Sequence, residues 1–472
     1  MQHLRLAAAL AILLSTALWS HAPAADNSPP NIVLILSDDQ AWTDYGFMDH
    51  KLIQTPNLDK LAARSAVFTR GHVPTALCRP SLATLVTGLY AHQHKITGND
   101  PSHALAEPNT PEYADLRERL IGHIDRQPTL PKLLAERGYR SHQSGKWWEG
   151  PYRRGGFTHG MTRGFPNPGG RHGDDGLQIG RAGLKPVFDF VDEAVAEKKP
   201  FFLWYAPMLP HTPHNPPERL LAKYRDQVES LQVAKYYAMC EWFDETCGEL
   251  IDFIDEKGLT KNTLFVYLAD NGWIQDPNAN GYALRSKQSP NEGGVRQPIM
   301  VSWPGVIAPG KRNDLVSSID LVPTMLSAAG AKIPPGLPGL DLMPVVRDGK
   351  SLNRDTIFGE TFAHDIADVD HPEASLIYRW AIEGKWKLLL TYDGALGRYA
   401  STHPRTEKRP QLFDLSADPH EEKNLAAKQP EVVARLAGKL FQHANRRFGT
   451  ALAVHGCRHN ASGITGPFPA RK

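Results

Sequence analysis

Three unbroken runs of apolar residues constrain the fold of this chain more than any other feature. They cover residues 32–36 (Ile-Val-Leu-Ile-Leu), 201–206 (Phe-Phe-Leu-Trp-Tyr-Ala) and 264–268 (Leu-Phe-Val-Tyr-Leu). A strand that is apolar at every position is buried on both faces, which is typical of a parallel sheet covered by helices. We therefore expect an α/β fold.

Oxygen-bearing side chains follow two of these runs. Asp38 and Asp39 come after the first run, and Asp270 and Asn271 come after the third. Ligands of α/β sheets bind at the carboxyl ends of the strands, and adjacent carboxylates repel each other unless a cation lies between them. A set of hard oxygen ligands favours Ca²⁺ or Mg²⁺ over zinc. A solvated turn explains a single Asp-Asp pair equally well, and the two pairs converge only if their strands are close.

Residues 78–88 (Cys-Arg-Pro-Ser-Leu-Ala-Thr-Leu-Val-Thr-Gly) predict a helix that begins at a cysteine. Pro80 suits the first turn, where a backbone N–H has no helical partner. Cys78 then lies at the N-terminal end, where unpaired amides and the helix dipole favour anions. This position suits a nucleophile that attacks an oxyanion ester, although a buried structural cysteine is the simpler interpretation of Cys-X-Pro alone.

The chain resembles the type I, formylglycine-dependent sulfatases of the alkaline phosphatase superfamily, over roughly residues 30–445. In that family a Cys-X-Pro-X-Arg core directs oxidation of the cysteine to formylglycine. The matching segments are Cys78, Pro80 and Ser81, Thr87-Gly88, Tyr90–His94, Thr55–Asp59, Gly145-Lys146-Trp147, Pro210-His211-Thr212-Pro213, Lys287 to Pro298, and Leu412–Leu425.

The resemblance implies a large mixed, mostly parallel sheet with a smaller C-terminal α+β subdomain, and hydrolysis of a sulfate ester. It implies formylglycine at position 78, made by a maturation enzyme, as the nucleophile. A calcium ion, or Mg²⁺, would be held by Asp38, Asp39, Cys78, Asp270 and Asn271, while Lys146, His211 and Lys287 would contact the sulfate. The implied substrate is a sulfated small molecule, oligosaccharide or polysaccharide.

Two positions depart from the family pattern. Leu82 stands where the family has arginine, and Trp148 stands where it has a histidine that helps to break the covalent intermediate. His142 and His92 are candidates for that base. Two alternatives therefore stay open: a phosphodiesterase or phosphonate monoester hydrolase of the same superfamily, and an inactive homologue that binds sulfated glycans.

Other segments predict the surroundings of the site. Residues 99–127 are polar and proline-punctuated, which indicates a long irregular surface insertion. The glycine-rich segment 150–183 predicts a substrate loop, because arginine binds sulfates and carboxylates and aromatic rings stack on sugars. Its arginines are Arg153, Arg154, Arg163, Arg171 and Arg181. Helices are expected at 127–137, at 218–257, either continuous or broken, and at 430–446, and a hairpin is expected at 379–391.

The ends of the chain and its composition set further limits. Residues 1–24 read as a secretory signal peptide, with a membrane anchor as the alternative, so we expect a periplasmic or secreted protein without a membrane after signal removal. The 53 basic and 51 acidic residues nearly cancel, which gives no reason to expect nucleic acid as a partner. We expect a catalytic domain at 30–345, a C-terminal subdomain at 346–447 and a tail at 448–472.

Four cysteines are too few for a disulfide-stapled secreted fold. Cys240 and Cys247 lie on one predicted helix, about 10.5 Å apart along its axis, which is too far for a disulfide between them. Either is free to pair with Cys457.

Overall fold

The computed structural model describes residues 29–403 and 407–448, without the side chains of 445–448. The predicted signal peptide, the tail beyond 448 and Cys457 lie outside the described residues. Cys78, Cys240 and Cys247 are free, buried thiols. Within the described part of the chain, no helix has both the length and the apolar character needed to cross a bilayer.

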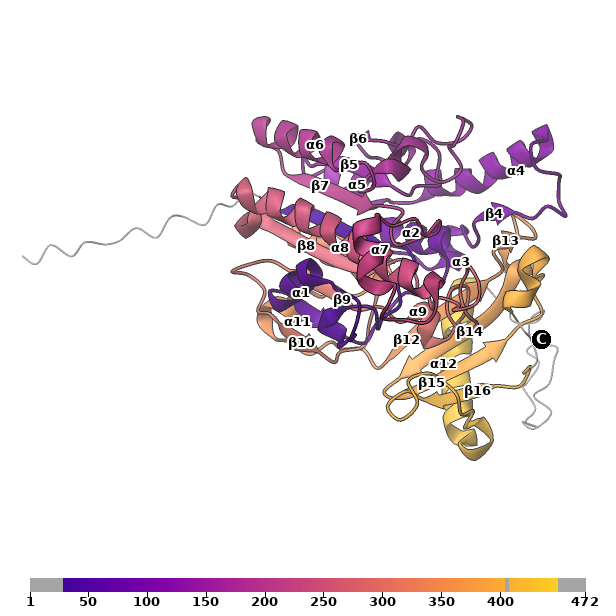
Figure 1. Cartoon of the computed structure of the whole chain (residues 1–472). Coiled ribbons are helices and arrows are strands. Elements are labelled where there is room, and N and C mark those ends of the chain that lie inside the picture. Colours follow the sequence, from indigo (N-terminus) through magenta and orange to yellow (C-terminus); the bar gives the residue numbers. More distant parts are fainter. Residues whose placement is uncertain (1–28, 404–406, 449–472) are drawn as a thin grey trace, which may run out of the picture.

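An eight-stranded sheet forms the centre of the larger part of the molecule (Figure 1). Its order is β10 (Gly310–Arg312), β2 (Ala66–Phe68), β9 (Ile299–Ser302), β8 (Thr263–Ala269), β1 (Asn31–Ser37), β7 (Phe201–Ala206), β5 (Arg140–Gly145) and β6 (His159–Gly160). Strand β9 runs antiparallel to β2 and β8, and the other pairs are parallel. The three apolar runs are the neighbouring strands β7, β1 and β8, so the predicted mixed, mostly parallel sheet is confirmed.

Alternate residues of these strands supply two cores on opposite faces of the sheet. The even-numbered residues of β1 pack with α2 (Cys78–Thr87), α5 (Leu130–Ala135), α10 (Leu321–Ala328) and α11 (Met343–Asp348). The odd-numbered residues pack with α1 (Pro56–Ala63), α6 (Lys185–Ala196) and α8 (Leu231–Glu256). Helices on both faces explain why the strands are apolar at every position.

A second, antiparallel sheet lies beside the first (Figure 1). Its order is β12 (Thr356–Phe362), β14 (Leu376–Glu383), β15 (Trp386–Thr391) and β16 (Gln411–Asp414). Helix α12 (Pro430–Phe448) covers one face of this sheet through Val433, Leu436 and Leu440. The predicted hairpin, terminal helix and smaller α+β part are confirmed, whereas β12 was not predicted.

Short elements connect these layers. They are α3 (Ala91–His94), α7 (Glu218–Tyr224), α9 (Glu292–Val295) and the two-stranded pairs β3 (Gly71–His72) with β11 (Val316–Ser317) and β4 (Asp100–Pro101) with β13 (Asp365–Ile366). The helix expected at 218–257 is broken into α7 and α8, and the helix expected at 127–137 is shorter, since α5 covers only 130–135.

The prediction that residues 99–127 are irregular was wrong. The segment contains β4 and helix α4 (Pro111–Ile121). Thr110 caps this helix by accepting the Tyr113 N–H, and Pro111 occupies the first helical position. The buried face of α4 includes Arg117 beside Tyr113 and Leu120, so its amphipathic pattern was hidden by a polar residue.

Candidate active site

The two acidic strand ends converge because β1 and β8 pair in register up to Ser37 and Ala269. The next residues therefore lie side by side. The backbone N–H of Asp39 donates to Asp270 Oδ1 at 3.2 Å, and Asn271 Nδ2 donates to Asp39 Oδ1 at 2.7 Å. Asp39 has a φ of 65°, a left-handed conformation that is uncommon for a residue other than glycine. The structure thus brings together the four oxygen-bearing residues identified in the sequence.

Cys78 faces this group from the first residue of α2, as expected. Its Sγ lies 3.8 Å from Asp38 Oδ1 and 3.9 Å from Asp39 Oδ1. Burial raises the pKa of the Cys78 thiol well above its usual value, so the unmodified residue stays protonated at neutral pH. A buried, protonated thiol is a poor nucleophile and a poor ligand for a hard cation.

Lys146 lies on the other side of Cys78, directly after β5. Its Nζ is 2.6 Å from Asp38 Oδ2 and 3.5 Å from Cys78 Sγ. The preceding Gly145 has a φ of 84°, and a Cβ there would lie 1.8 Å from the Ala206 carbonyl oxygen. Only glycine allows this close approach to β7, which sets the direction in which Lys146 leaves the strand.

Lys287 and His211 contact Asp39. Lys287 Nζ lies 2.7 Å from the Asp39 carboxylate, and His211 Nε2 lies 3.3 Å from Asp39 Oδ2. Nδ1 of His211 is 2.6 Å from the Thr212 carbonyl oxygen, so it carries a proton and donates to that oxygen. All four predicted side chains, Cys78, Lys146, His211 and Lys287, therefore surround the two aspartates.

The charges in this cluster shift one another's pKa values. Burial acts against ionisation of Asp39, but Lys287 and His211 outweigh it and hold the Asp39 pKa below its usual range. Asp270 has no such cation in contact, so burial, with Asp39 nearby, raises its pKa to about 6. Burial and then the charge of Lys146 lower the pKa of His211. The cluster therefore holds three carboxylates but only two lysines, and Asp270 is the carboxylate that no lysine contacts.

The donor set fits a hard divalent cation. Asp270 Oδ2 and Asn271 Oδ1 are buried and have no hydrogen-bond partner among the described residues. Single ligand atoms from Asp38, Asp39, Cys78 and His211 lie within 4.8 Å of one another. Orphaned oxygens are costly in a protein interior unless an ion or water contacts them, and they match the preference of Ca²⁺ and Mg²⁺.

The two departures from the family pattern have clear structural surroundings. Leu82 lies on α2 and packs in the core between this helix and the sheet. The centre of the Trp148 ring lies 5.2 Å from Lys146 Nζ and 5.4 Å from the centre of the His172 ring, to which it is tilted by 39°. His172 is thus an imidazole near the cluster, although sequence reasoning placed it only in the glycine-rich loop.

Neither histidine proposed to replace the missing base contacts the cluster. His142 packs on Phe190, in the core on the α6 side of the sheet, and His92 pairs with Glu360 at 2.7 Å. Both expectations were wrong. His142 faces the α6 side of the sheet, away from α2, and His92 on α3 faces Glu360 of the smaller sheet.

The arginines of the expected substrate loop have different roles. Arg154 pairs with Asp125 and Glu118, and Arg163 pairs with Asp175. Arg153 lies over the Tyr152 ring. Arg181 donates to the carbonyl oxygens of Met208 and His211 and so supports the His211 turn. Of the five, Arg171 lines a pocket.

A buried ion pair beside the nucleophile position was missed from the sequence. Arg79, which follows Cys78, donates to Glu149 at 2.8 and 2.7 Å. Its backbone N–H also donates to Asn99 Oδ1 at 3.1 Å. The spacing of Arg79 and Glu149 along the chain carries no signal, so only the tertiary structure shows that they support the start of α2.

Lysines and oxygen ligands gathered around one nucleophile position suit the transfer of a tetrahedral oxyanion group, whose developing charge they stabilise. The class of protein that this fold and this site define is therefore a metal-assisted ester hydrolase. The chain belongs to the sulfatase family, whose model, described as Sulfatase, matches residues 30–331. A second model, N-sulphoglucosamine sulphohydrolase, C-terminal, matches residues 283–446.

Individual relatives agree with this assignment. Arylsulfatase A of Homo sapiens is 30% identical over 86% of this chain and 86% of that protein. N-acetylgalactosamine-6-sulfatase of Canis lupus familiaris is 29% identical over 88% of this chain and 86% of that protein. The crystal structure of Ps i-CgsB in complex with k-i-k-neocarrahexaose superposes with a TM-score of 0.68 at 25% identity, covering 89% of this chain and 94% of that chain. The chain is thus an enzyme that hydrolyses sulfate esters.

Proposed function

We propose that this enzyme removes sulfate from a sulfated carbohydrate, with formylglycine derived from Cys78 as the nucleophile and Ca²⁺ or Mg²⁺ as the cation. The observation that carries the proposal is the position of Cys78, within 4 Å of Asp38, Asp39 and Lys146 at the carboxyl edge of the sheet. The family resemblance supports formylglycine, and the unpaired oxygens of Asp270 and Asn271 support the cation.

In this proposal Asp38, Asp39, Asp270 and Asn271 hold the cation. The bound cation would polarise the sulfate oxygens and the nucleophile together. Lys146 and Lys287 orient the sulfate and stabilise the charge that develops on its oxygens. His211, once protonated at Nε2, gives its proton to the departing alcohol oxygen. Burial and Lys146 lower the pKa of His211, and the contact with Asp39 acts against that shift.

A carbohydrate substrate is supported by the names of the relatives, one of which is an N-acetylgalactosamine-6-sulfatase and another of which was crystallised with k-i-k-neocarrahexaose. The signal-like N-terminus supports export to the periplasm or the exterior of the cell. Because Leu82 replaces the family arginine, the proposal includes a maturation enzyme that accepts Cys-X-Pro-X-Leu.

The test combines activity with the chemical state of residue 78. We expect Cys78→Ala to lower release of sulfate by roughly a thousand-fold or more, as for the loss of other nucleophiles. Cys247→Ala, which changes a buried cysteine in the core on the α8 side of the sheet, is the matched control and should retain activity. Peptide mass spectrometry of protein from its native host should find formylglycine at 78.

Two results would overturn the proposal. Full activity of Cys78→Ala would exclude residue 78 as the nucleophile. An unmodified Cys78 in protein that binds sulfated glycans without cleaving them would favour the inactive homologue. Paired assays with an aryl sulfate and an aryl phosphate address the phosphodiesterase alternative, because a preference for the phosphate would contradict a sulfatase.

A further inference from the structure

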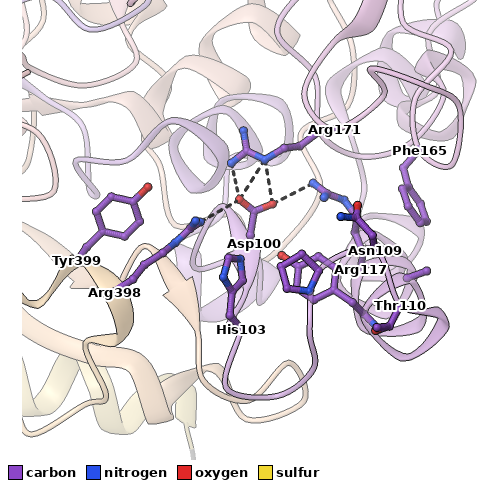
Figure 2. A pocket seen from close by; sticks show the side chains of 12 residues that line it. Asp100, His103, Asn109, Thr110, Arg117, Phe165, Arg171, Arg398 and Tyr399 are labelled. Carbon is purple, nitrogen blue, oxygen red and sulfur yellow. Dashed lines mark hydrogen bonds and ion pairs between the residues drawn. The ribbon is translucent and has the colours of Figure 1, made fainter. Parts of the chain in front are cut away.

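A cavity outside the cysteine cluster lies where three distant segments meet (Figure 2). Its volume is about 380 Å³. Its walls come from the segment around Asp100 and α4, from the glycine-rich loop, and from the C-terminal part at Arg398 and Tyr399. Pockets at the junction of two parts of a fold are common ligand sites.

Three guanidinium groups converge on the buried carboxylate of Asp100 in this cavity (Figure 2). Arg117 Nη2 lies 2.9 Å from Asp100 Oδ1, and Arg171 Nε lies 3.1 Å from Oδ2. Arg398 Nη2 lies 4.0 Å from Oδ2, while its Nε donates to Asp365 at 2.6 Å. Three positive charges therefore face two carboxylates, which leaves the pocket net positive.

The guanidinium groups have donors that no described residue uses. Nη1 of Arg171, Nη1 of Arg398, and Nε and Nη1 of Arg117 make no hydrogen bond to any residue in 29–403 or 407–448. The side chains of Arg171 and Arg398 are 40% and 42% exposed. Because both oxygens of Asp100 already accept hydrogen bonds, the unused guanidinium N–H groups remain as charged donors for a ligand in the cavity. This chemistry selects a carboxylate or a sulfate.

Aromatic rings stand at two sides of these arginines. Figure 2 shows Phe165 beyond Arg117 and Tyr399 beside Arg398. The Arg117 guanidinium lies over the Phe165 ring at 5.6 Å. Aromatic rings offer apolar surface with little conformational freedom to lose, and sugar rings pack on such surface. The cavity therefore fits an anionic group that is attached to a ring.

Two short chains of contacts connect the lining of the cavity to the cysteine cluster. Asn99, next to Asp100, accepts the N–H of Arg79, which follows Cys78. Arg171 precedes His172, and the His172 ring contacts the Trp148 ring beside Lys146. A substrate of oligosaccharide size that presents its sulfate ester to Cys78 would reach the cavity with a neighbouring group.

We propose that this cavity is a subsite for a second anionic group, a carboxylate or a sulfate, on a sugar unit next to the sulfate ester that is cleaved. The proposal rests on the proposed function, because it takes Cys78 as the position of the reaction. It assigns to this enzyme a substrate that carries at least two negative charges and makes Arg117, Arg171 and Arg398 residues that determine specificity.

The experiment measures binding without turnover. Full-length Cys78→Ala is titrated by calorimetry with three disaccharides: one monosulfated and otherwise neutral, one monosulfated with a uronate, and one disulfated. We expect at least one of the doubly charged ligands to bind about ten-fold more tightly than the singly charged, monosulfated one, since one charge-assisted pair changes affinity by about that factor. The preferred ligand shows whether the second group is a carboxylate or a sulfate.

The arginine variants locate the effect. Arg171→Gln and Arg398→Gln, each in the Cys78→Ala chain, should reduce the advantage of the doubly charged ligand to less than about three-fold. Arg119→Gln is the control. Arg119 is on the same helix as Arg117, and its side chain is exposed to a similar extent as that of Arg398. It pairs with Asp370, which does not line the cavity. If Arg171→Gln does not fold, Arg398→Gln alone provides the test.

Equal affinity for all three disaccharides would overturn the proposal. So would an Arg398→Gln variant that keeps the full preference. These outcomes are separate from the proposed function, because a wild-type enzyme that releases no sulfate would contradict the reaction whatever the Cys78→Ala chain binds. Conversely, normal sulfate release with no preference in binding would leave the reaction intact and remove the subsite.

Discussion

At the scale of single residues, Asp39 is the centre of the site. It accepts from Asn271, contacts Lys287 and His211, and holds Asp270 through its own backbone N–H. Its left-handed backbone turns the chain at the end of β1, so that its carboxylate faces the end of β8. Such strain is common where a side chain must be held in one functional orientation.

We expect Asp39→Asn to weaken binding of Ca²⁺ by at least about ten-fold, because the affinity of an oxygen site depends on the charge of its ligands. Calorimetric titration of the metal-free protein measures this directly. Asp255→Asn, which changes an exposed carboxylate paired with Arg64, should bind Ca²⁺ as the wild type does. Unchanged affinity in Asp39→Asn would remove this residue from the metal site.

At the scale of elements, helix α12 stabilises the smaller sheet through a narrow apolar face. Val433, Leu436 and Leu440 are buried against Ala381, Leu388 and Leu412 of β14, β15 and β16. Without α12, the apolar side chains on this face of the four-stranded sheet would be exposed to water. This sheet also anchors the chain that continues to Arg398.

Leu436→Ala should lower the free energy of unfolding by about 2–5 kcal/mol, the usual cost of a cavity at a fully buried leucine. Chemical denaturation followed by fluorescence measures the change. The control is Gln442→Ala, an exposed position on the same helix, which should differ from the wild type by less than about 0.5 kcal/mol. If Leu436→Ala also lowers the free energy of unfolding by less than about 0.5 kcal/mol, α12 does not stabilise the sheet.

At the scale of the whole molecule, buried ion pairs join the smaller sheet to the larger part. Glu360 on β12 contacts His92 on α3 at 2.7 Å, and Lys387 on β15 contacts Glu292 on α9 at 2.9 Å. Glu292, in the Lys287 to Pro298 segment, therefore has a structural role. Both pairs are almost completely buried, so removal of one partner leaves an uncompensated charge.

The Glu360 pair predicts a specific response to acid. Burial alone would raise the pKa of Glu360, but His92 and Arg379 lower it to about 2. Since this is below the unfolded value of about 4.3, ionised Glu360 stabilises the fold above about pH 4.3, and the stabilisation, about 3 kcal/mol, is lost as the pH falls towards 2. Glu360→Gln should flatten the pH dependence of the unfolding free energy in that interval.

Denaturation midpoints measured at a series of pH values between about 2 and 7 test this expectation. Other buried carboxylates also titrate at low pH, so the comparison is between variants. Glu431→Gln, at an exposed position of α12, should follow the wild-type curve. If the stability curve of Glu360→Gln also matches the wild-type curve, the pair with His92 does not stabilise the contact between the smaller sheet and the larger part.

The sequence by itself determined the central strands, the helix at Cys78 and the residues that end β1 and β8, because these depend on local patterns of burial and on short motifs. The resemblance to the sulfatase family implied that Lys146, His211 and Lys287 contact the sulfate, and in the structure Lys146 contacts Asp38 while His211 and Lys287 contact Asp39. Because β8, β1, β7 and β5 are neighbours, their ends bring Asp38, Asp39, Asp270 and Lys146 to one edge of the sheet, whereas Cys78 and Lys287 reach it from the start of α2 and from a loop.

Only the tertiary structure decided what lies around that centre. Helix α4, the place of His172, the Arg79 and Glu149 pair, and the arginines around Asp100 all depend on contacts between segments far apart in the chain. A loop arginine has the same local sequence whether it pairs with a surface aspartate or faces a cavity. Its partner is set by packing, and packing is a property of the whole fold.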